Sequence, residues 1–311
     1  MDILIHLWSG LKENTIWILL TKIPLFYKTD LLFRKITDFF IFSSLFIAIC
    51  AVLMVYQTYY LFNIPVSLPL LAFVFCGSVC SYNFHWYLTP PHVNTTSTKT
   101  LWNINYKYVH LGLTIIGLAG AAFFAFILID HWVWLGLTAF LTFLYTAPKI
   151  PHPLFINLRK IAIGKTIFLA FAWAHITALL PILIYLQKPD LQHIIFFSNR
   201  FLFIYAICIL FDRRDVEADR REGIKSLITF LSSNGIDRLF WLTIILFTIT
   251  SVILLHWFSP LIVTILLIPG IITCMLYYPS QQNTSDYLYY FILDGLMALS
   301  APLLILTKFA Q

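Results

Sequence analysis

Long runs of apolar residues without a charged residue are the feature that most constrains the fold of this chain. Several runs reach the length of roughly 17 to 25 residues that a helix needs to cross a bilayer. Strands of a membrane barrel would read as short alternating segments, which the sequence lacks. Hydrophobic residues make up 60% of the 311 residues, above the share of about half that soluble domains show. The sequence therefore predicts an all-α fold, a polytopic membrane bundle.

Nine transmembrane helices are predicted from these runs and from the Pro and polar residues between them. They cover residues 37–61, 65–88, 108–129, 131–147, 161–186, 196–211, 238–257, 259–278 and 286–307. Residues 1–36 are expected to form an N-terminal cytoplasmic or interfacial segment, because aromatic residues alternate there with Lys and Arg. The transmembrane domain is expected to span residues 37–307.

The distribution of basic residues predicts the orientation in the membrane. Lys and Arg gather in the N-terminal segment and in the connections after the second, fourth and sixth helices, whereas Lys188 alone occupies an opposite connection. The positive-inside rule then places the N-terminus in the cytoplasm and, after nine helices, the C-terminus outside the cell (inner) membrane. The net charge of +6 follows this topology, so no nucleic-acid partner is expected. The polar connections would form a cytoplasmic cap over the bundle.

Cysteines offer no disulfide signal, because all five lie inside the apolar runs. Cys76 and Cys80 share a helix face, and we interpret them as small packing residues rather than metal ligands.

One segment, FDRRDVEADRREGIKSL from Phe211 to Leu227, concentrates the charge of the chain. On a helix, Asp212, Asp215 and Asp219 follow the spacing i, i+3 and i+7 and form an acidic stripe. A solvated loop with internal salt bridges is the alternative interpretation.

The spacing of charges within this segment argues against that alternative. Glu217 has basic residues at helical spacing on both sides, whereas Asp215 and Asp219 form a like-charge pair that costs about 0.2–0.5 kcal/mol. A divalent cation would remove this repulsion. Oxygen ligands favour Mg²⁺, which binds through one or two carboxylates together with phosphate oxygens.

The stripe carries a resemblance to a known family. Asp212-x-x-Asp215-x-x-x-Asp219 followed by GIKSL resembles the second aspartate-rich motif of the UbiA prenyltransferase superfamily. The stretch LYTAPKIPHPLFINLRKIAIGK resembles the Tyr-x-x-Pro segment of that family with its following basic residues. The resemblance covers about residues 37–307. It implies a nine-helix intramembrane enzyme whose polar cap binds a prenyl diphosphate through Mg²⁺.

The resemblance also implies roles for individual residues. Asp215 and Asp219 would bind the metal. The catalytic set would be Asp212, Asp215, Asp219 and Lys149. The residues expected to bind substrate are Asn83, Tyr145, Arg159, Lys160 and Lys225. The basic residues can pair with phosphate oxygens, although the positive-inside bias alone would also explain them.

The chain departs from the family at the end of the second predicted helix, SYNFHWYLTPPH. Asn83 fits the first aspartate-rich motif of the family, but its acidic positions are occupied by Phe84, Tyr87 and Pro91. No acidic residue occurs between Asp38 and Asp130, so one of the two magnesium half-sites is missing.

These features predict an integral membrane prenyltransferase-like protein. It would transfer a prenyl group from an isoprenyl diphosphate to an aromatic or lipid acceptor, with aromatic side chains shielding the carbocation. A terpene-cyclase-like member without an external acceptor is one alternative. A non-catalytic membrane protein that binds an isoprenoid or an anionic lipid is another, and the missing first motif favours it.

Overall fold

The computed structural model describes residues 31–89, 97–150, 152, 155, 165–186, 188–221 and 226–309. The chain divides into two units, residues 1–40 and 41–311. Helix α3 (Leu31–Phe42) begins in the first unit and ends in the second. Residues 1–30, most of the predicted N-terminal segment, lie outside the described residues.

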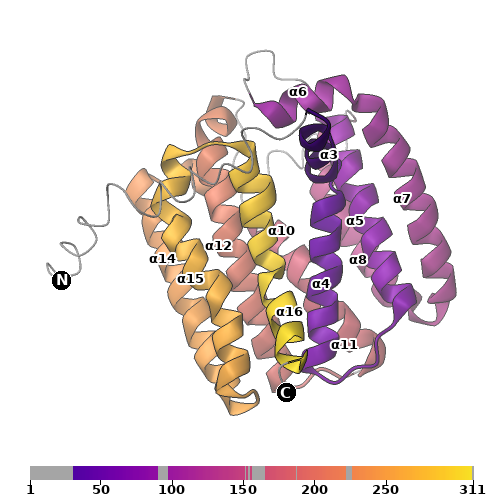
Figure 1. The fold of residues 1–311 in the computed structure, drawn as a ribbon, viewed down its shortest axis with the longest axis vertical. Helices are drawn as coiled ribbons and strands as arrows, with labels where there is room; N and C mark the ends of the chain where they lie inside the picture. The colour runs from indigo at the N-terminus through magenta and orange to yellow at the C-terminus, as the bar shows by residue number, and fades with distance from the viewer. Residues whose placement is uncertain are drawn as a thin grey trace, which may run out of the picture. The chain divides into compact units, whose positions relative to one another are not determined.

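All secondary structure in the described residues is helical, as the sequence predicts (Figure 1). The α-helices after α3 are α4 (Leu45–Leu61), α5 (Leu68–Leu88), α6 (Thr98–Asn105), α7 (Lys107–Ile127), α8 (Trp132–Thr146), α10 (Lys165–Ala174), α11 (Leu180–Tyr185), α12 (Leu191–Arg221), α13 (Leu227–Phe230), α14 (Ser233–Ile253), α15 (Pro260–Gln282) and α16 (Asp294–Phe309). Short 3-10 helices are η1 (Ile129–His131), η2 (Ala147–Lys149) and η5 (Leu254–His256), and π-helices are η4 (His175–Leu179) and η6 (Leu288–Leu293).

Seven helical segments in the described residues are long and apolar enough to cross a membrane. An eighth is counted if Arg34–Phe42 and Leu45–Leu61 form one broken span. The fourth predicted helix, 131–147, forms α8, whose 15 residues rise only about 22 Å, less than the roughly 30 Å of a hydrocarbon core. The chain is thus built as a multi-pass membrane protein, whereas the count of nine spans stays a prediction.

Helix α12 is the central helix of the second unit. It packs against α10, α14 and α15, and every residue from Phe203 to Leu210 is buried. By contrast, α7 packs mainly on α5 and exposes Ile116, Phe123 and Phe126. Those side chains would face lipid in a bilayer, since a helix with an exposed apolar face is stable only in an apolar medium.

Close approach of α5 and α7 depends on small residues. A Cβ atom at Gly117 would lie 2.7 Å from the backbone nitrogen of Cys80 and 2.8 Å from the carbonyl oxygen of Cys76. A Cβ at Gly120 would meet the Sγ atom of Cys76. All five cysteines are free, and Cys76 and Cys80 form the surface on which α7 rests.

A buried arginine joins three helices in the bundle interior. Arg200 of α12 donates from Nη1 to the carbonyl oxygens of Thr177 and Met54, at 2.6 and 3.0 Å. Its Nη2 donates to Oε1 of Gln57. Pro181 lacks the N–H that would bond to the carbonyl of Thr177 within a regular helix. Arg200 and the hydroxyl of Thr58 both donate to this carbonyl, each at 2.6 Å, and so satisfy it as the membrane interior requires.

Candidate functional site

Helix connections that are distant in sequence meet at one end of the bundle, the end at which α6 lies in Figure 1. The contacts that join them are Lys149 with Thr89, Thr166 with Asp212, Arg213 with Asp237, and Ser97 with Asp286. We call this cluster the polar end and define it by Lys99, Lys149, Asp212, Arg214, Asp215, Asp286 and Tyr290. Its predicted position on the cytoplasmic side stays a prediction.

The acidic stripe lies on the last turns of α12. The helix continues without a break to Arg221, so the helical placement of Asp212, Asp215 and Asp219 is correct. Asp212 accepts a hydrogen bond from the hydroxyl of Thr166 on α10. The side chains of Asp215 and Asp219 are partly exposed. Asp212 is partly exposed as well, so all three carboxylates of the stripe lie near the surface of the bundle.

Contacts of the neighbouring charges change the electrostatic argument made from helical spacing. Arg214 binds Asp215 with two hydrogen bonds, from Nε to Oδ1 at 2.8 Å and from Nη2 to Oδ2 at 3.2 Å. Arg220 binds Glu217 at 3.1 Å, as the spacing predicts. The adjacent arginine thus neutralises part of the charge that a cation was expected to offset.

Arg214 is the residue that connects the stripe to the rest of the polar end. Its side chain is 11% exposed, and its Nη1 lies 4.0 Å from Oδ1 of Asp286. Its Nη2 donates to the hydroxyl of Tyr290 at 3.2 Å, and its guanidinium lies 4.2 Å from the ring centroid of Tyr289. In the described part of the chain, Nη1 faces Asp286 but makes no hydrogen bond, so both of its N–H donors remain for an anionic ligand.

Lys99 brings a second cation into the same cluster from α6. Its Nζ donates to the carbonyl oxygen of Phe42 at 2.5 Å and lies 4.5 Å from the ring centroid of Trp86. Its backbone N–H donates to Oδ2 of Asp286 at 2.9 Å. Burial lowers the pKa of Lys99 to about 7, against the opposing attraction of Asp286 and Asp294. A nearby anion would favour its charged form.

Lys149 and Tyr145 lie where the end of α8 meets the end of α5. Lys149 donates to the hydroxyl of Thr89, and its Nζ lies 5.6 Å from the ring centroid of Trp86. The ring of Tyr145 stacks on His85 with centroids 4.9 Å apart. The structure therefore places Lys149 beside the same tryptophan as Lys99.

Asn83 lies deeper, with a fully buried side chain. Its amide nitrogen donates to the carbonyl oxygens of Ser43 and Val79, and its Oδ1 lies 2.7 Å from Nδ1 of His110. These contacts hold α5 against neighbouring segments and occupy the amide. Arg159, Lys160 and Lys225, also expected to bind substrate, lie outside the described residues.

The chemistry of the donor set decides whether Mg²⁺ fits. Among the described residues, no group of three or more His, Cys, Asp or Glu side chains gathers around one point. Asp215 and Asp219 on successive turns of α12 still suit Mg²⁺, because this ion takes one or two carboxylates and completes its shell with water and phosphate oxygens.

Four charged residues of this region were not among the predicted site residues: Lys99, Arg214, Asp286 and Asp294. Asp294 interacts electrostatically with Lys99 and Arg214, and Asp286 contacts both. A signal for the two acids was present, since both fall in the ninth predicted helix and ionisable residues within membrane spans indicate a function by default.

Comparison of the chain with protein-family models, with curated proteins and with solved structures finds no match.

Proposed function

We propose that this chain is an integral membrane prenyltransferase-like enzyme that binds an isoprenyl diphosphate at the polar end. The observation that carries the proposal is the stripe of Asp212, Asp215 and Asp219 at the end of α12, beside Arg214 with its free donors. The carboxylate oxygens suit a cation, and the arginine N–H groups suit phosphate oxygens. The apolar bundle beside them suits the hydrophobic tail of an isoprenyl diphosphate.

The proposed reaction is the ionisation of an allylic diphosphate followed by capture of the cation. The C–O bond to the diphosphate breaks, and its electron pair leaves with pyrophosphate. The new bond forms to a carbon of an aromatic acceptor or to a hydroxyl oxygen of a lipid acceptor, and the acceptor then loses a proton from that atom. Magnesium held by Asp215 and Asp219 would supply charge for the leaving group.

The residues of the chain supply the remaining stabilisation. Nη1 of Arg214 donates to a phosphate oxygen, and the ammonium groups of Lys149 and Lys99 add positive charge where the pyrophosphate leaves. Trp86, which lies against both lysines, offers a ring face to the developing carbocation. Asp212 orients the stripe through its bond with Thr166.

Binding of farnesyl diphosphate over a magnesium titration, measured by calorimetry, tests the proposal. Asp219→Asn should abolish the magnesium-dependent part of binding, and Lys149→Ala should weaken binding to a similar degree. Glu217→Gln is the matched control on the same helix, because Glu217 pairs with Arg220 and should leave binding unchanged. Equal losses in all three variants would contradict a role for the stripe.

A second candidate is a non-catalytic protein that binds an isoprenoid or an anionic lipid. Two observations favour it. Two aromatic residues and a proline stand at the acidic positions of the first motif, and Arg214 already donates to both oxygens of Asp215. Pyrophosphate release, measured with and without added acceptor, separates the candidates. Release only with acceptor supports transfer, release without it supports cyclisation, and binding without release supports the non-catalytic candidate.

The missing half-site provides a further test. Phe84→Asp combined with Tyr87→Asp should tighten magnesium-dependent binding of farnesyl diphosphate, because two more carboxylates would share the metal charge. If only this double variant binds the diphosphate, the native chain does not perform this chemistry.

A further inference from the structure

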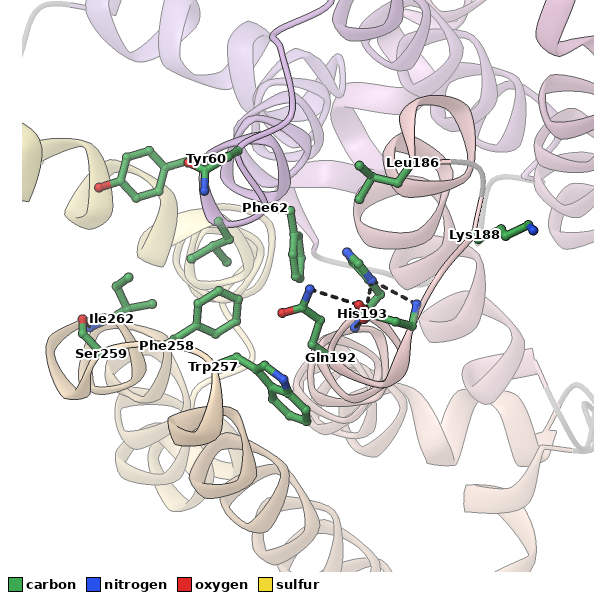
Figure 2. A pocket seen from close by; sticks show the side chains of 13 residues that line it. Tyr60, Phe62, Leu186, Lys188, Gln192, His193, Trp257, Phe258, Ser259 and Ile262 are labelled. Carbon is green, nitrogen blue, oxygen red and sulfur yellow. Dashed lines mark hydrogen bonds and ion pairs between the residues drawn. The ribbon is translucent and has the colours of Figure 1, made fainter.

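A cavity of about 750 Å³ opens at the other end of α12, away from the polar end. Figure 2 shows the side chains that line it. It lies between the ends of α4 and α11 and the beginnings of α12 and α15. Its volume falls in the range of about 300–1,000 Å³ that small-molecule sites show. His193 in this cavity and Arg214 are separated by about 30 Å along α12, so the cavity is distinct from the proposed diphosphate site.

The wall of the cavity is amphipathic. Aromatic and aliphatic side chains form one part, and polar side chains from the helix ends form the other. The apolar group is Tyr60, Leu61, Phe62, Leu186, Trp257, Phe258 and Ile262, and the polar group is Asn63, Lys188, Asp190, Gln192, His193 and Ser259. Such a wall suits a ligand that has an apolar body and a polar tip. Tyr and Trp side chains at membrane interfaces have the same amphipathic character.

Among the polar residues of the cavity, His193 has a buried ring nitrogen without a hydrogen-bond partner in the described part of the chain. Its side chain is 5% exposed, and its ring centroid lies 4.5 Å from that of Phe62. Both side chains are labelled in Figure 2. That buried nitrogen is Nε2. Buried polar atoms are almost always paired with protein, water or ligand, so this nitrogen indicates a partner from outside the chain.

Asp190 determines what kind of partner Nε2 accepts. The carboxylate Oδ1 of Asp190 lies 2.6 Å from Nδ1 of His193. The backbone N–H of Asp190 also lies 3.1 Å from Nδ1, which would suit an unprotonated nitrogen. The carboxylate contact is shorter and charge-assisted, so it governs and holds a proton on Nδ1. With its proton on Nδ1, a neutral imidazole has Nε2 as its hydrogen-bond acceptor.

We propose that this cavity binds an amphipathic alcohol whose hydroxyl donates to Nε2 of His193. The hydrocarbon chain of the alcohol lies against Phe62, Phe258 and Ile262. An isoprenoid alcohol and a fatty alcohol share this chemistry. The proposal does not depend on the function proposed for the polar end.

Photo-crosslinking in phosphatidylcholine nanodiscs tests this site. The probe is a farnesol derivative that carries a diazirine and retains its hydroxyl, and mass spectrometry maps its attachment to the peptides around Phe62 and Trp257. Farnesol, dodecanol and farnesyl methyl ether compete with the probe. Farnesol should compete about three- to tenfold better than the ether, which lacks the donor that one hydrogen bond requires. Comparison of farnesol with dodecanol identifies the preferred source.

Two variants locate the effect. His193→Phe keeps a ring against Phe62 and removes the acceptor, so the preference for alcohol over ether should disappear. Lys188→Gln changes an exposed residue of the rim and should leave the preference unchanged. Equal competition by alcohol and ether in the native protein, or attachment outside these peptides, would overturn the proposal. Both of these outcomes are measured on the native protein. The proposal can therefore be tested even if His193→Phe does not fold.

Discussion

Substituting alanine for Gly117 tests the packing of α7 on α5 most directly. The new Cβ would lie 2.7 Å from the backbone nitrogen of Cys80, where contacts below 3.0 Å force a shift. The atoms in contact belong to backbone, so α7 must move away from α5 as a body. Overpacking of this kind costs about 1–3 kcal/mol, against a gain in helix propensity of up to about 1 kcal/mol.

Gly112 on the same helix is the matched control. Its Cβ would have nothing within 4 Å, so Gly112→Ala gains helix propensity without a clash. We expect Gly117→Ala to be less stable than Gly112→Ala by about 2 kcal/mol. Unfolding of the purified variants in one detergent, followed by tryptophan fluorescence, measures this difference.

Double variants separate backbone contact from side-chain contact. A Cβ at Gly120 meets the Sγ atom of Cys76 at 2.6 Å, so Cys76→Ala should restore much of the stability that Gly120→Ala loses. Cys80→Ala should not rescue Gly117→Ala, because the backbone nitrogen remains in place. Equal stability of the two single variants at Gly112 and Gly117, or rescue by Cys80→Ala, would refute the argument.

Three further predictions concern topology, protonation and the buried arginine. In a background without native cysteines, Thr284→Cys should react only with membrane-permeant thiol reagents, whereas Lys188→Cys should also react with impermeant ones. The reverse labelling would show that the predicted orientation is inverted. Because the folded chain holds the pKa of Lys99 at about 7 rather than 10.5, the unfolded chain binds more protons between these values, so the unfolding free energy should rise with pH in this window. Lys99→Met should flatten that rise, and an unchanged pH profile would contradict the burial of the ammonium group. Arg200→Lys should lower the unfolding free energy by about 2 kcal/mol, because one ammonium group cannot reach all the acceptors that the planar guanidinium bridges. A variant as stable as the native protein would show that this hydrogen-bond network is not needed for stability.

Several properties of this chain follow from its sequence alone. The length of its uncharged runs is enough to predict helices that cross a membrane, because a backbone in hydrocarbon must satisfy its own hydrogen bonds. The register of the stripe also follows from sequence, since Asp212, Asp215 and Asp219 share one surface of any regular helix. Some predicted spans differ from the observed helices at their ends, as does 196–211, which is part of α12 (Leu191–Arg221). The first predicted span, 37–61, is instead divided between α3 and α4, which are bent by 58° at their junction.

The partners of the charged residues could not be predicted in this way. Helical spacing compares residues three and four positions apart, and it therefore omitted the bond between the adjacent Arg214 and Asp215. It also cannot reveal that Asp286 receives the backbone N–H of Lys99, because nearly two hundred residues separate them and only the tertiary fold brings the start of α6 to the segment before η6.

Asn83 illustrates the same limit within the candidate site. Its position in the sequence matches a substrate-binding residue, whereas tertiary packing directs its amide to Ser43 and Val79. Apolar length and helical periodicity act locally, so the sequence by itself determined a helical membrane protein with an acidic stripe on one helix. Which cations meet that stripe, and where a cavity remains at the other end of α12, depended on how helices pack, because the backbone and side-chain contacts that decide it join residues far apart in the chain.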